Sequence, residues 1–150
     1  MNDLSSILNW IGNTIGNSTL GTTATTLKGA IAELNGRTTK VTGTPQQFTD
    51  GIEVTWGETT LTRIGDIVEC KLRFGVRTNL PANKKLFQIN APFKPANVLR
   101  PIWYNWDKTS VHRFNLYTTG DLCTVDALPS GNQFIVTFFY VAADVQESET

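Results

Sequence analysis

The chain has 150 residues, of which 40% are hydrophobic and 17% charged, and its 13 basic and 13 acidic side chains give a formal net charge of zero. Without an excess of basic charge, the sequence argues against a nucleic-acid partner or binding to an anionic membrane surface. No apolar run approaches the length of a membrane span and no secretory signal is evident, so we expect no membrane insertion.

The first predicted element is a helix over residues 3–16. Its apolar residues recur at steps of four, three and four, which is the spacing of one helix face. They are Leu4, Leu8, Ile11 and Ile15. Glycines at 12 and 16 loosen the second half, and we expect the helix to break within residues 16–19.

A second helix is predicted over residues 22–36, where threonines can cap the first turn and Asn35-Gly36 predicts the end. Its apolar seam has the alternating spacing of a coiled coil and consists of Leu20, Ala24, Leu27, Ile31 and Leu34. A helix this short is marginal alone in water. We therefore interpret residues 1–35 as an oligomerisation and attachment segment covered by copies from other chains. The alternative is that the seam packs on the chain's own β domain.

Residues 36–50 contain Gly36, Gly43 and Pro45 with little periodicity, which predicts a linker. From residue 51 the apolar period becomes two, as in β-strands. The clearest strand is Ile67–Val76, whose even-numbered residues should face a core while Glu69, Lys71 and Arg73 face water. Further strands are predicted at 52–56, 59–64, 86–89, 102–105, 111–117, 122–125 and 133–141.

The last of these strands, Gln133–Val141, is nearly continuously apolar, so we expect it at the centre of a sheet with both faces covered. Short strands at regular spacing, separated by Gly and Pro turns, predict a mainly β chain: an antiparallel, jelly-roll-like β-sandwich over residues 51–145. A barrel remains the alternative. Residues 146–150 are polar and predict a loose tail.

No catalytic or metal-binding constellation is apparent, so we expect neither an enzyme nor a cofactor. The single histidine, His112, is interpreted as a solvent-facing strand residue or a ligand donor rather than a catalytic base. Asp107, Asp121 and Asp126 fall at turns or strand ends, where they do not form a convincing glycosidase pair. Cys70 and Cys123 lie in predicted strands and are interpreted as buried free thiols, with a disulfide as the alternative.

The segment IWYNWDK, residues 102–108, is the candidate binding surface. Alternation places Trp103 and Asn105 on one face of a strand, with Tyr104 and Trp106 on the other. Aromatic rings stack on the C–H faces of sugars, and neighbouring amides and carboxylates bind hydroxyl groups. The candidate glycan-binding residues are Trp103, Asn105, Trp106, Asp107 and Lys108. Burial in the core or in a subunit interface is the alternative for these tryptophans.

Four short motifs occur in an order that resembles bacteriophage tail-fibre and baseplate receptor-binding proteins. They are the helical segment 20–35, the hairpin Thr62–Val68, the Arg-Pro segment Asn97–Pro101 and the turn Thr119–Leu122. This resemblance implies a homotrimer in the virion, on the tail or the capsid surface, that is assembled in the host cytoplasm.

The same resemblance implies attachment to other virion proteins through the N-terminal segment and recognition of a host cell-surface polysaccharide. A structural virion component, such as a head fibre, decoration protein or baseplate adaptor, is the alternative function. A glycan depolymerase is a third hypothesis, for which the sequence offers no convincing carboxylate pair.

Overall fold

The computed structural model describes residues 26–144, and the chain divides between Thr39 and Lys40 into a helical unit and a β unit. Several predictions fall outside the described residues: the helix over residues 3–16, the loose tail, and part of the second seam. The oligomerisation residues concerned are Leu4, Leu8, Ile11, Ile15, Leu20 and Ala24.

Helix α2 spans Leu27–Thr38 and begins where the Thr26 hydroxyl accepts a hydrogen bond from the Gly29 N–H, at 3.1 Å. The prediction that it ends at Asn35-Gly36 is wrong. The Asn35 carbonyl accepts hydrogen bonds from both the backbone N–H and the hydroxyl of Thr39, at 2.8 and 2.6 Å. With this carbonyl satisfied from the next turn, the helix continues past Asn35 to Thr38. Among residues 26–144 no helix is long and apolar enough to cross a membrane.

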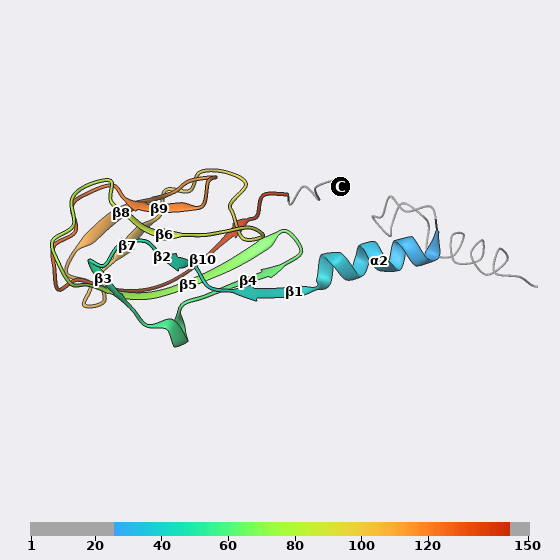
Figure 1. Ribbon diagram of the computed structural model, residues 1–150, viewed down its shortest axis with the longest axis horizontal. Helices are drawn as coiled ribbons and strands as arrows, with labels where there is room; N and C mark the ends of the chain where they lie inside the picture. The colour runs from blue at the N-terminus through green and yellow to red at the C-terminus, as the bar shows by residue number, and fades with distance from the viewer. Residues whose placement is uncertain (1–25, 145–150) are drawn as a thin grey trace, which may run out of the picture. The chain divides into compact units, whose positions relative to one another are not determined.

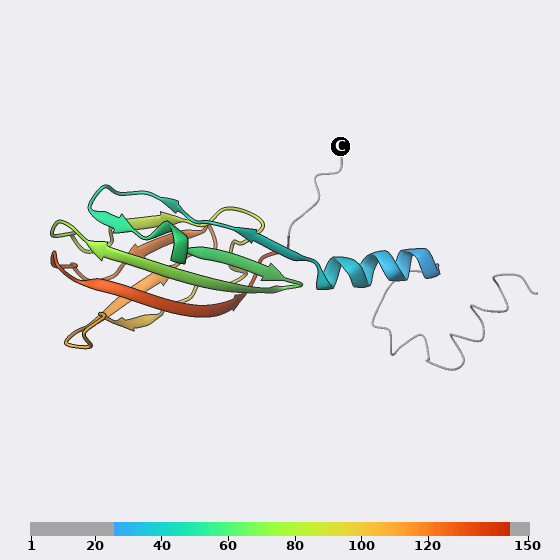
Figure 2. The same ribbon diagram turned by 90° about the horizontal axis from the view of Figure 1, so that it is seen from below.

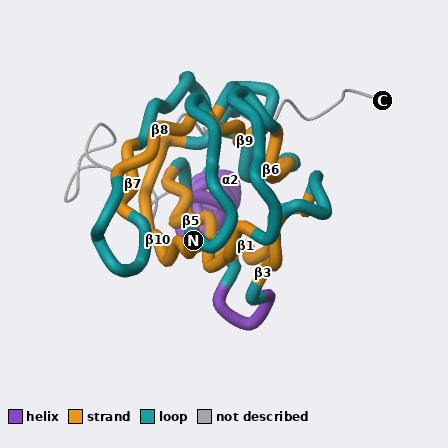
Figure 3. The backbone as a smooth tube through the Cα atoms, turned by 90° about the vertical axis from the view of Figure 1, so that its left-hand side faces the viewer, coloured by secondary structure: helices purple, strands orange, loops and turns teal. Residues whose placement is uncertain are grey.

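The β unit contains two antiparallel sheets that face each other across a common core (Figures 1 and 3). One sheet contains β1 (Lys40–Gly43), β4 (Thr60–Ile64), β5 (Ile67–Val76) and β10 (Gln133–Val141), in that order, and β3 (Ile52–Val54) also pairs with β5. The other has the order β2 (Gln46–Gln47), β6 (Lys85–Gln88), β9 (Asp121–Thr124), β8 (Val111–Leu116) and β7 (Ile102–Tyr104). A short 3-10 helix, η2 (Trp56–Glu58), separates β3 from β4. The predicted β-sandwich is therefore confirmed.

The segment predicted to be a linker instead holds two of these strands. Lys40 of β1 pairs with Ile64 of β4, and Gln47 of β2 pairs with Phe87 of β6, so the segment contributes to both sheets. Both strands are short and mostly exposed edge strands, and this is why they show no buried apolar alternation in the sequence. The β unit thus begins at Lys40 rather than at residue 51.

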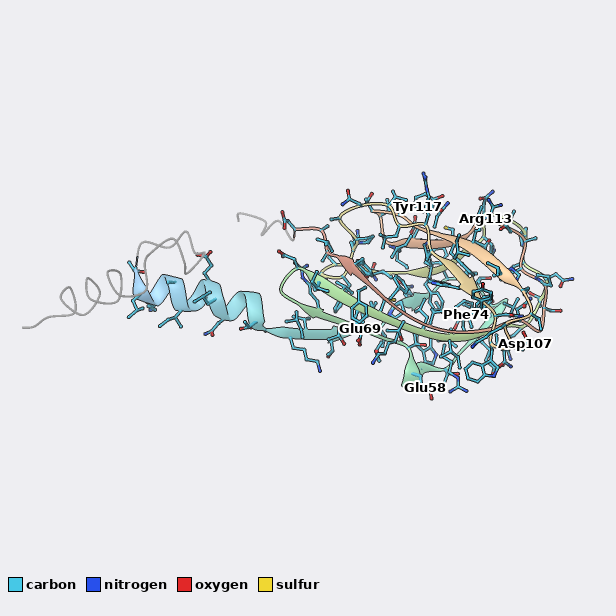
Figure 4. The ribbon with its side chains drawn as sticks, turned by 180° about the vertical axis from the view of Figure 1, so that it is seen from behind. Glu58, Glu69, Phe74, Asp107, Arg113 and Tyr117 are labelled. Carbon is cyan, nitrogen blue, oxygen red and sulfur yellow. The ribbon has the colours of Figure 1, made fainter. Side chains whose placement is uncertain are left out.

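The predicted alternation of β5 is confirmed, because its even-numbered residues Val68–Val76 are at most 4% exposed. Phe74 lies between the sheets (Figure 4), stacked on Phe134 at 5.2 Å and edge-on to Phe87 at 5.5 Å between ring centroids. Cys70 and Cys123 are free thiols as predicted, although only Cys70 is fully buried. Burial raises the pKa of the Cys70 thiol.

The prediction that the last strand is central and covered on both faces is wrong. Among the described strands β10 pairs with β5 alone and forms an edge of its sheet, as Figure 2 shows. Its inward residues Phe134 and Tyr140 are buried, but Ile135, Phe139 and Val141 are 42%, 63% and 52% exposed. Apolar residues on the outer face made the strand look doubly buried in the sequence.

Arg63 joins three segments that are distant in the sequence. Its guanidinium donates to the carbonyls of Gly65 at 2.7 Å, Pro92 at 2.6 Å and Ala143 at 3.3 Å. The side chain is only 13% exposed. Hydrogen bonds from a charged donor that is largely withdrawn from water are among the stronger ones in proteins. Arg63 therefore holds the β4–β5 turn, the loop after β6 and the end of β10 together.

We expect Arg63→Ala to lower the free energy of unfolding by about 1–3 kcal/mol, because it leaves partly buried carbonyls without a donor. Arg77→Ala is the matched control, since that side chain is 60% exposed and 3.8 Å from Glu53; it should change stability by no more than about 0.5 kcal/mol. Urea unfolding of both variants measures the difference. Equal losses would show that Arg63 does not join these segments.

Candidate functional site

Alternation along the end of β7 determines which aromatic side chains reach solvent. Trp103 and Asn105 are 8% and 6% exposed, whereas Tyr104 and Trp106 are 62% and 64% exposed. The predicted division into two faces is therefore confirmed. However, the Trp103 ring packs against Phe114 at 4.4 Å and Phe138 at 5.3 Å between centroids. Trp103 is a core residue, and its assignment to glycan contact is wrong because no ligand can reach its ring face.

Asn105 links the two turns that form the candidate site. Its side-chain NH₂ donates to the Thr109 hydroxyl at 2.9 Å and to Asn132 Oδ1 at 3.1 Å, and its Oδ1 accepts from the Ser110 N–H at 3.0 Å. These bonds occupy both of its donor hydrogens and one acceptor site. Asn105 was predicted to contact glycan directly. The structure shows it fixing the β7–β8 turn against the β9–β10 turn, and its contact with glycan stays a prediction.

A surface hollow of about 240 Å³ lies between these two turns. It is lined by Asn105, Trp106, Asp107, Gly131 and Gln133. The Trp106 N–H donates to the Gln133 carbonyl at 2.6 Å, which joins the end of one sheet to the start of the edge strand of the other. The Trp106 indole therefore stands on a backbone that is held at both turns.

Asp107 is the charged group of the hollow. Its Oδ1 accepts from the hydroxyl and the N–H of Thr109, at 2.6 and 3.2 Å. These hydrogen bonds, led by the one from the hydroxyl, hold the pKa of Asp107 below its usual range, so the carboxylate remains ionised near neutral pH. Asp107 can therefore accept hydrogen bonds from a hydroxyl-bearing ligand.

Lys108, the last of the predicted glycan residues, occupies the left-handed position of the turn, with φ 58°, and its N–H donates to the Asn105 carbonyl at 2.9 Å. Its side chain is exposed, but it does not line the hollow. Gln133 and Gly131 do line it and were missed. They lie far along the chain from Trp106, so only knowledge of the strand neighbours could have identified them.

His112 is 9% exposed, so the interpretation as a solvent-facing residue is wrong. It pairs with Trp103 across β7 and β8 and shares the inward face, where its ring lies edge-on to Phe134 at 5.5 Å. Its Nε2 lies 2.8 Å from the Ser110 hydroxyl. Within residues 26–144 no carboxylate hydrogen-bonds this ring, and no cluster of potential metal ligands occurs.

The other two candidate carboxylates are held by basic side chains. Asp121 Oδ1 lies 2.7 Å from Lys85 Nζ, and Asp126 accepts two hydrogen bonds from Arg113, at 2.5 and 2.9 Å. These partners lower the pKa of both carboxyl groups. Asp121 and Asp126 thus serve in ion pairs on the outer face of the second sheet. The absence of enzymatic activity remains a prediction from the sequence.

Comparison with solved structures shows a fold shared with a phage protein. The chain aligns with the receptor-binding protein gp15 of Listeria phage PSA with a TM-score of 0.50 over 96% of this chain and 99% of that one. The sequences are 10% identical. No family model matches the sequence, and a search of curated proteins finds no match. The chain therefore has a fold like that of a phage receptor-binding protein.

The two tryptophans of the candidate site should differ sharply when replaced. Trp103→Ala removes a ring from the core and should lower the free energy of unfolding by about 3–5 kcal/mol. Trp106→Ala removes an exposed ring and should change stability by less than about 0.5 kcal/mol. Urea unfolding followed by circular dichroism measures both. A large loss for Trp106→Ala would mean that its ring supports the fold rather than being free for a ligand.

Proposed function

We propose that the chain is a bacteriophage virion protein that binds a host cell-surface glycan through the hollow beside Trp106. The observation that carries this proposal is a single one: a large indole, 64% exposed, held next to a carboxylate and an amide by two fixed turns. The fold shared with a phage receptor-binding protein supports the virion assignment.

The residues of the hollow suit a sugar ring. The flat indole of Trp106 can cover an apolar C–H face of the ring, as aromatic side chains cover other apolar surfaces. The Asp107 carboxylate accepts hydroxyl hydrogen bonds, and the Gln133 amide can both accept and donate them. Because the turns are already fixed, little conformational entropy is lost when a ligand binds.

A structural virion component without a glycan ligand is the second candidate, and an apolar patch elsewhere on the β unit favours it. Ile64 pairs with Ile67, which in turn pairs with Val141, so these three form a row across β4, β5 and β10. Together with Phe139 they are 48–63% exposed. Exposed apolar patches of this kind mark protein–protein contacts. A head fibre, decoration protein or baseplate adaptor would use such a surface.

We further propose that the protein is a homotrimer held by its N-terminal helical segment, which also attaches it to neighbouring virion proteins. The described part of the seam supports self-association, because Ile31 and Leu34 of α2 are 50% and 36% exposed. A Leu/Ile seam open to water is covered when helices pack side by side. Three copies would present three glycan sites to one cell surface, which raises the overall avidity. The placement on the tail or the capsid surface follows from this role.

We expect Trp106→Ala to weaken binding to host cells or to arrayed wall glycans by at least about tenfold. Tyr117→Ala is the control, since that ring is 38% exposed and lies away from Asp107, just after the opposite end of β8 (Figure 4). Binding of fluorescently labelled protein measures the effect. If Trp106→Ala binds as well as the native chain, the site is misassigned; if the native chain binds no glycan, the structural role replaces the proposal.

We expect the native chain to scatter light as a trimer of its 16.6 kDa subunit. The double substitution Ile31→Glu and Leu34→Glu should give a single-chain species with unchanged β circular dichroism, because charge in the seam opposes packing. Ala32→Glu is the control, since Ala32 is exposed and lies outside the seam. A native single-chain species at micromolar concentration would contradict the trimer.

A further inference from the structure

A second hollow, of about 220 Å³, lies on the outer face of the sheet formed by β3, β5 and β10. The residues that line it from the outer face and its edge are Glu53, Thr55, Arg73, Gly75, Gln133 and Ile135. Gln133 also lines the hollow beside Trp106. Both hollows therefore reach the same residue, Gln133, at the start of β10.

The floor of the second hollow is a glycine in the middle of a cross-strand row. Gly75 of β5 pairs with Glu53 on one side and with Gln133 on the other. Its φ is not in the left-handed region, and an added Cβ would meet only ordinary contacts, with Gln133 Cγ at 3.7 Å and the Asn132 carbonyl at 4.0 Å. Neither the backbone nor the packing requires a glycine here, although glycine weakens a strand interior. The missing side chain leaves space for a ligand.

The walls of this hollow carry both donors and acceptors. The guanidinium of Arg73 forms an ion pair with Glu58 of η2, and Arg77 lies 3.8 Å from Glu53. Two acidic and two basic groups thus balance within the surroundings of the hollow. Balanced charges suit a neutral, hydroxyl-rich ligand better than a polyanion.

Resting on the proposed function, we infer that the two hollows form one groove across Gln133 that binds a neutral carbohydrate chain, with one sugar beside Trp106 and a following sugar over Gly75. The ligand is accordingly a stretch of polysaccharide rather than a single terminal sugar. Affinity then rises with chain length, because the second sugar adds contacts over Gly75 that a monosaccharide cannot reach.

The test uses the full chain with neutral oligosaccharides of graded length built from N-acetylglucosamine, glucose, galactose or rhamnose. The native protein should bind oligosaccharides at least about tenfold more tightly than the matching monosaccharide. Gly75→Thr fills the floor with a β-branched residue that strands favour, and it should remove this gain while retaining monosaccharide binding. Lys71→Thr, which places the same side chain on the same face of β5, should keep the gain. Gly75→Ala should fall between Gly75→Thr and the native chain.

Two results would overturn the inference while the proposed function stands. One is a native affinity that does not change with oligosaccharide length. The other is a Gly75→Thr or Gly75→Ala variant that, with native circular dichroism, keeps the full gain. If the native chain binds none of these sugars at any length, the proposed function fails for neutral glycans and the inference fails with it.

Discussion

Trp103 packs its ring against Phe114 and Phe138 between the two sheets, and this contact sets the direction of the side chains that follow it at the end of β7 and just beyond. Because side chains alternate along a strand, burying Trp103 also turns Asn105 inward and Tyr104 and Trp106 outward. Asn105 then hydrogen-bonds both the β7–β8 turn and the β9–β10 turn. Burial of the Trp103 ring therefore leaves the Trp106 ring exposed, beside the polar groups of a hollow whose turns are fixed.

The position of β10 at a sheet edge places its first residue beside Trp106 and leaves its outer face exposed. The start of β10 receives the hydrogen bond from the Trp106 N–H, while its outward side chains remain uncovered by another strand of the described chain. Gln133 consequently faces both hollows, and Gly75 beside it keeps the second one open. At the other end of the same face, Ile67 and Val141 are exposed and present an apolar surface instead.

The sequence predicts those parts of the fold in which one face is apolar and the other polar. The bounds of β5, its buried side and the division of residues 103–106 into two faces all follow from period two. The bounds of β10 follow from its nearly continuous apolar run. The edge strands β1 and β2 were missed because polar edge strands carry no such pattern. The central position of β10 was wrongly predicted because apolar residues on an exposed outer face look the same as buried ones.

The site could be predicted only in part, because it combines residues of one local segment with residues of distant strands. Local alternation identified Trp106 and Asp107 in one segment, but it could not decide which of two faces enters the core. Trp103 was therefore assigned to the ligand and His112 to solvent. Gln133 and Gly75 reach the groove through strand pairing between distant segments, which no local pattern encodes.

The most direct measurement of the central claim is an amide and indole chemical-shift titration of the labelled full chain with a wall oligosaccharide that it binds. We predict that the largest shifts fall on the Trp106 indole and on the amides of Asp107, Gly131, Gln133 and Gly75. Shifts gathered instead around Arg113 of β8 and Tyr117 just after it, with the Trp106 indole unchanged, would contradict the account.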